Sequence, residues 1–66
     1  MTKKQTKVLD FIKRYHQVHK FAPTLREIAE SFEFNINAAR QHVIALEKKG
    51  VITRTEGLSR SITVVK

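Results

Sequence analysis

The sequence predicts a mostly α-helical α+β domain in which three helices precede a two-stranded β-hairpin. Three observations lead to this prediction. Threonines at positions 2 and 24 each begin a Thr-x-x-Gln/Glu capping box in front of an amphipathic segment, and Asn35 precedes a third such segment. After Gly50 the apolar pattern changes from a helical period to alternation. The chain has 66 residues, which suffices for one small core, so residues 1–66 are expected to form a single domain.

The first helix is expected over about residues 3–19. Its apolar stripe runs from Val8 to His19 and is flanked by charged residues on the opposite face. The segment Phe21-Ala22-Pro23 ends this helix, because a residue that precedes proline disfavours the α conformation.

The second and third helices are expected over about 25–32 and 35–49. The second follows the capping box at Thr24, and Gly50 ends the third. One side of the third helix is apolar and is assigned to the core. Its members are Ile36, Ala39, Val43 and Leu46.

Two β-branched runs, at about 51–55 and 61–65, complete the chain as a hairpin with a five-residue tip. A lone hairpin is unstable in water, so this one is expected to pack on the helices. Helix, short helix, turn, helix and hairpin is the order of a winged helix-turn-helix. A plain three-helix bundle is the alternative, and the β-branched tail argues against it.

Basic charge dominates both ends of the chain. The formal charge is +7; residues 1–23 carry +5, residues 24–34 carry −2 and residues 35–66 carry +4. A pI near 10.3 is typical of nucleic-acid-binding domains. The same composition also fits a lysine-rich surface that only keeps the protein in solution.

The outward face of the third helix carries the groups that read base edges in a major groove. Arginine pairs with guanine, asparagine or glutamine pairs with adenine, and an apolar group meets the thymine methyl. The residues on this face are Asn37, Arg40, Gln41 and Ile44, with Lys48 further along for a phosphate. A solvated polar face is the alternative interpretation, and Ile44 fits either a methyl contact or a protein interface.

Phosphate contacts are expected from two further places. The second helix begins with Thr24 and Arg26, where free amides and the helix dipole favour an anion. The hairpin supplies the others, which are Arg54, Ser59, Arg60 and Ser61. The alternative for each is that it is an ordinary surface or turn residue that does not contact DNA.

These motifs resemble the N-terminal DNA-binding domain of the LexA-type SOS repressors, across nearly the whole chain. The matching segments are Thr2 to Ile12, Pro23-Thr24, Glu27-Ile28-Ala29, Asn37-Ala38-Ala39 with His42, Lys49-Gly50-Val51-Ile52, and Gly57 with Ser59-Arg60. The resemblance implies a winged helix-turn-helix repressor domain that binds operator half-sites as a dimer. It also implies that the segment from Asn37 to Gln41, Ala38 included, reads the major groove.

The sequence departs from the family pattern at several points. Arg40 and Gln41 stand where the family tends to have acidic residues, so its operator is not carried over. Glu33 stands where glycine is usual in the turn, and the segment before Asn37 is one residue shorter. These 66 residues contain no self-cleaving Ser/Lys domain, so induction by autoproteolysis is not expected.

Other function classes are disfavoured. No cysteine is present, and His16-x-x-His19 lacks a further ligand nearby, so no enzyme, cofactor or metal site is expected. Both histidines, and His42, are expected to pack against the core. The expected partner is double-stranded DNA, which the protein is expected to bind as a homodimer on a repeated operator. The expected location is the cytoplasm, at the nucleoid. No membrane or small-molecule ligand is expected.

A protein-interaction module that binds another transcription regulator is the main alternative. RNA binding is a less favoured hypothesis, because the sequence shows no exposed aromatic pair for stacking unpaired bases.

Overall fold

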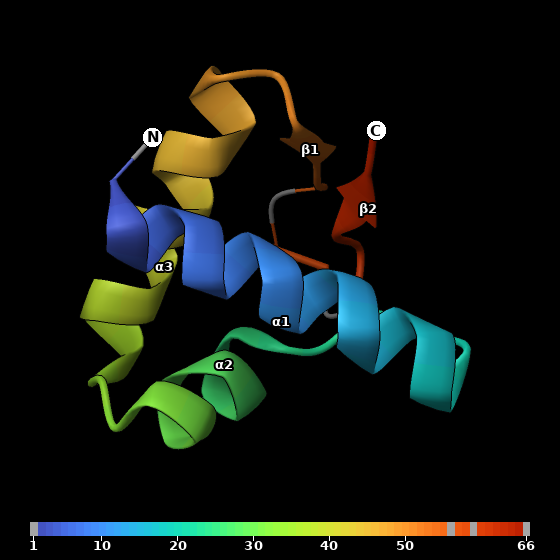
Figure 1. The fold of residues 1–66 in the computed structure, drawn as a ribbon, viewed down its shortest axis with the longest axis horizontal. Helices are drawn as coiled ribbons and strands as arrows, with labels where there is room; N and C mark the ends of the chain where they lie inside the picture. Colours follow the sequence, from blue (N-terminus) through green and yellow to red (C-terminus); the bar gives the residue numbers. More distant parts are fainter. Residues whose placement is uncertain (1, 56, 59, 66) are drawn as a thin grey trace.

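A computed structural model describes residues 2–55, 57–58 and 60–65. Within these residues the chain forms three helices and an antiparallel hairpin (Figure 1). The elements are α1 (Lys3–His19), α2 (Leu25–Phe32), α3 (Ile36–Lys48), β1 (Ile52–Thr53) and β2 (Thr63–Val64). This confirms the predicted winged helix-turn-helix, a mostly helical α+β fold. We call residues 52–64 the wing.

Local capping positions the start of each helix. Thr2 and Thr24 form complete capping boxes, in which the side chain at the third helical position bonds back to the cap amide. Asn35 Oδ1 accepts a hydrogen bond of 2.7 Å from the amide of Ala38. The starts of α2 and α3 therefore follow from residues three positions apart in the chain.

The turn between α2 and α3 contains a left-handed glutamate. Glu33 has φ 58° and ψ 34°, and the next amide, that of Phe34, donates to the Ala29 carbonyl at 2.9 Å. This backbone closes the end of α2 in the way that a C-terminal glycine normally does. A glutamate adopts the conformation at a cost of about 1 kcal/mol.

The core lies where the three helices and the wing meet. Its fully buried side chains include Val8 and Ile12 from α1, Ile28 from α2, Leu46 from α3 and Ile52 from β1. None of the helices within the described residues is both long and apolar enough to cross a membrane.

One residue assigned to the core of the third helix lies outside it. Ala39, Val43 and Leu46 are fully buried, but Ile36 is 46% exposed. Ile36 is the first residue of α3, so its side chain has no preceding helical turn to cover it.

The expectation that His16 and His19 pack in the core is wrong, since both are exposed. They occupy the last turn of α1, which extends past the rest of the molecule (Figure 1). The His19 ring lies 4.1 Å from that of Tyr15, centroid to centroid. His42 is half-buried and stacks on Phe34 at 5.0 Å.

The wing has a shorter ladder than the expected runs at 51–55 and 61–65. In the described part of the hairpin Ile52 pairs with Val64 and Thr53 with Thr63, and the Val65 amide donates to the Val51 carbonyl at 2.9 Å. Beyond this ladder, the Ser61 hydroxyl replaces backbone pairing: it accepts from the Thr55 amide at 3.0 Å and donates to the Thr55 carbonyl at 3.1 Å.

Candidate nucleic-acid interface

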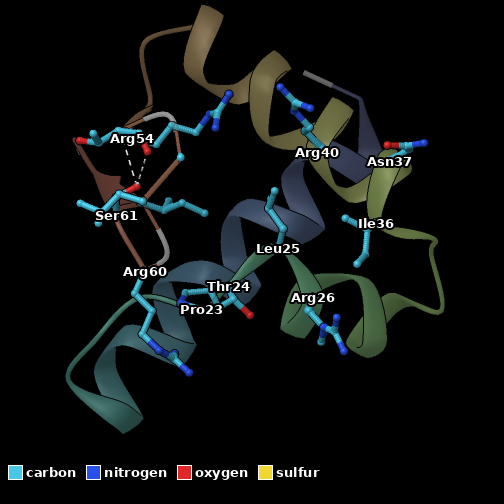
Figure 2. A pocket seen from close by; sticks show the side chains of 14 residues that line it. Pro23, Thr24, Leu25, Arg26, Ile36, Asn37, Arg40, Arg54, Arg60 and Ser61 are labelled. Atoms are coloured by element: carbon cyan, nitrogen blue, oxygen red, sulfur yellow. Dashed lines mark hydrogen bonds between the residues drawn. The ribbon is translucent and has the colours of Figure 1, made fainter.

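An open groove of about 570 Å³ lies between the N-termini of α2 and α3 and the wing (Figure 2). It gathers side chains from the starts of two consecutive helices and from the wing, which follows them in the sequence. The predicted site residues that line it are Thr24, Arg26, Asn37, Arg40, Arg54, Arg60 and Ser61. Predicted base-reading and phosphate-binding groups therefore share one surface.

The reading face of α3 is divided by the structure. Asn37 and Arg40 are exposed and line the groove, and Gln41 is exposed one position further on. Ala38 and Ile44 are half-buried. For Ile44 this differs from the exposed position considered from the sequence, because the packing of α3 covers part of its side chain.

The start of α2 forms the lower wall of the groove as drawn in Figure 2. The Thr24 hydroxyl accepts from the Glu27 amide at 3.1 Å, and Glu27 Oε1 accepts from the Thr24 amide at 2.9 Å. Arg26 is exposed in the first turn. The helix dipole and this cation both favour an anion at this end of α2.

Two cations lie at the edges of the surface. Arg54, at the base of the wing, donates from Nε to Glu47 Oε1 at 3.2 Å. Lys48 is the last residue of α3 and is exposed, outside the groove lining. Ser59, also predicted to contact phosphate, lies outside the described residues.

Arg60 is turned back onto the helices. Its Nη1 donates to Glu27 Oε1 at 3.0 Å and to the Ala22 carbonyl at 2.9 Å, and its Nη2 donates to Glu27 Oε2 at 2.9 Å. The Arg60 hydrogen bonds, followed by the one from the Thr24 amide, lower the pKa of Glu27 to about 2. Glu27 is therefore ionised throughout the neutral range.

Apolar residues also line the groove, which the sequence did not indicate. Leu25, Ile36 and Leu58 line it, and Leu58 is 63% exposed. The position of Ile36 directly after an N-cap was a usable signal for its exposure. Leu58 lies in the hairpin tip, where no periodic pattern indicates a direction.

Comparisons with known proteins identify relatives along the whole chain. The family model described as LexA DNA binding domain matches residues 1–61. Proteins named LexA repressor are 54% identical in Thermosipho melanesiensis and 48% identical in Thermosipho africanus, both across all of this chain. The LexA repressor of Petrotoga mobilis is 47% identical across 98% of it. The chain spans about a third of the length of these relatives.

Proposed function

The chain belongs to the LexA DNA-binding domain family, and we propose that it binds double-stranded DNA sequence-specifically and represses transcription by occupying an operator. This is a binding role and not a catalytic one. The observation that carries the proposal is the single groove that joins Asn37 and Arg40 of α3 to cations of α2 and the wing.

In this proposal the N-terminal half of α3 enters the major groove. Arg40 donates to guanine, while Asn37 and Gln41 pair with adenine. Ala38 allows close approach to the bases. The exposed part of Ile44 contacts a thymine methyl.

The phosphate contacts flank α3 on both sides. Thr24 and Arg26 bind one backbone segment at the start of α2, where the dipole adds to the charge. Arg54 and Ser61 approach DNA from the wing, and Lys48 from the far end of α3. Contacts of this kind set register and affinity but carry no sequence information.

Selection from a random duplex library at several salt concentrations tests the proposal. We expect enrichment of one motif, and a slope of log affinity against log salt of about −4 to −5 for roughly five phosphate contacts. Lys48→Ala is expected to weaken binding to all duplex sequences by the same factor and to flatten the salt slope by about one unit. Absence of an enriched motif would contradict the proposal.

We also propose that the protein acts in the cytoplasm, at the nucleoid, as a homodimer on a repeated operator. One small domain reads too few base pairs to define a genomic site. Inverted or direct repeats among the selected sequences would support this part, and single unpaired half-sites at saturation would contradict it.

A second groove favours a different candidate function, namely a protein-interaction module for another transcription regulator. It has about 530 Å³ and is lined by residues of α1 and α2, among them Phe11, Tyr15 and Val18, and Val18 is 73% exposed. Binding through such apolar contacts would respond far less to salt than DNA binding does.

A further inference from the structure

We infer that Arg60 is a positioning residue that holds the wing against the N-terminus of α2, so that both walls of the groove meet DNA as one body. For its effect on DNA the inference rests on the proposed function. It replaces the phosphate contact predicted for Arg60 with a contact inside the protein.

The Arg60 guanidinium is surrounded by acceptors from other elements. The Glu27 carboxylate accepts from both terminal nitrogens, at 3.0 and 2.9 Å, in the bidentate geometry that suits arginine. The Ala22 carbonyl and the Tyr15 hydroxyl accept from Nη1 at 2.9 and 3.4 Å. Arg60 also lies over the Phe21 ring, 4.5 Å from its centroid. These contacts join the wing to the end of α1, the loop after it and α2.

Glu27 serves two structures at once. Its Oε1 accepts from the Thr24 amide, which completes the capping box of α2, and from Arg60 Nη1. The group that caps α2 therefore also bonds the wing. A wing displaced from this position would leave the carboxylate without its two hydrogen bonds from Arg60.

The backbone supports the same conclusion. Arg60 has φ 57°, in the left-handed region that a residue with a side chain rarely adopts. Such a conformation persists where surrounding contacts overdetermine it. At Arg60 the contacts to Glu27 and Ala22 are of this kind, and they direct the side chain back to the helices.

A phosphate contact would require Arg60 to leave the carboxylate. The Glu27 charge neutralises the guanidinium, and both terminal nitrogens already donate to protein acceptors. Arg26 presents an exposed cation in the same groove without requiring this exchange. In this arrangement Arg60 fixes the position of the wing, and Arg26 supplies positive charge to the groove.

The sign of the effect of Glu27→Gln on DNA binding tests the inference. The amide keeps an oxygen for the Thr24 cap but loses the charge and one acceptor for Arg60. Electrostatics alone predicts tighter binding, since a negative charge next to DNA is removed. We expect the opposite, about fivefold weaker binding to a duplex selected by the wild-type chain, the upper range for a partly exposed ion pair.

Glu30→Gln is the matched control, because it removes the same charge from an exposed position of α2. It is expected to leave affinity unchanged or to raise it. If Glu27→Gln behaves like Glu30→Gln, the inference is overturned.

Arg60→Lys keeps the charge but not the bidentate geometry. A positioning role predicts about fivefold weaker binding, an unchanged salt slope, and no further loss when Glu27→Gln is added. A phosphate role predicts nearly wild-type affinity for Arg60→Lys, since lysine also binds phosphate, and a slope flatter by about one unit for Arg60→Gln.

A measurement without DNA separates failure of this inference from failure of the proposed function. Backbone order parameters of Gly57, Leu58 and Arg60, from ¹⁵N relaxation, are expected to fall in Glu27→Gln and Arg60→Lys but not in Glu30→Gln. Unchanged order parameters would overturn the positioning role. If they fall while the wild-type chain selects no duplex, the wing contact stands and the DNA function fails.

Discussion

The two walls of the groove are built in different ways. The helical wall, at the starts of α2 and α3, is held by caps that join residues three positions apart, such as Thr24 with Glu27 and Asn35 with Ala38. The wing wall has two paired positions in the ladder that its described residues form. It depends on contacts with distant segments, such as those of Arg60 with Glu27, 33 residues away, and with Tyr15, 45 residues away.

The difference teaches that the two walls respond to different changes. The caps formed by the side chains of Thr24 and Asn35 act on their own helices, whereas Glu27 contacts both walls. The wing is attached through its buried base and a few side chains. Loss of these contacts is therefore expected to separate the two walls of the groove. The following four predictions test this division, from the largest expected effect to the smallest.

Ile52→Ala is expected to destabilise the whole domain by about 2–4 kcal/mol, because Ile52 is 1% exposed and anchors the base of the wing in the core. Urea unfolding followed by circular dichroism measures the change. Thr53→Ala, at the exposed neighbouring position, is the control and is expected to cost under about 0.5 kcal/mol. A small effect of Ile52→Ala would show that the wing is independent of the core.

Arg40→Ala and Arg54→Ala compare the two walls in DNA binding. Arg40→Ala is expected to cost about 1–3 kcal/mol on the selected duplex and to relax the preference at one base pair. Arg54→Ala is expected to weaken binding to all duplex sequences by the same factor. Competition binding against a set of single-base variants measures both. Equal discrimination by wild type and Arg40→Ala would place the reading face elsewhere.

Thr24→Ala removes the cap of α2 and is expected to lower the free energy of unfolding by about 1 kcal/mol. Thr24→Ser keeps the hydroxyl and serves as its control. Ser61→Ala is the counterpart in the wing, where hydrogen exchange at the Thr55 amide is expected to rise while the amides of α2 stay protected. Faster exchange throughout α2 in Ser61→Ala would contradict the division.

Glu33→Gly is expected to stabilise the domain slightly, by about 0.5–1 kcal/mol, because glycine adopts the left-handed conformation without the steric cost. Thermal unfolding of the two proteins measures the gain. A loss of stability would mean that the Glu33 side chain contributes more than its backbone costs.

The sequence was sufficient for elements governed by short separations. The caps at Thr2, Thr24 and Asn35 set where the helices begin, and the change of period after Gly50 indicated the hairpin. Residues on one helix turn are neighbours whatever the tertiary fold, so Asn37 and Arg40 were assigned to a common face from spacing alone.

Tertiary structure alone decided which surfaces are covered and where long side chains go. Periodicity placed Ile36 in the core, but the packing of α2, α3 and the wing leaves it in the groove. The position of Arg60 in the hairpin predicted a phosphate contact, and in the fold its guanidinium contacts a carboxylate 33 residues away. A sequence pattern relates residues that are near one another along the chain, whereas burial and ion pairing depend on segments that folding brings together.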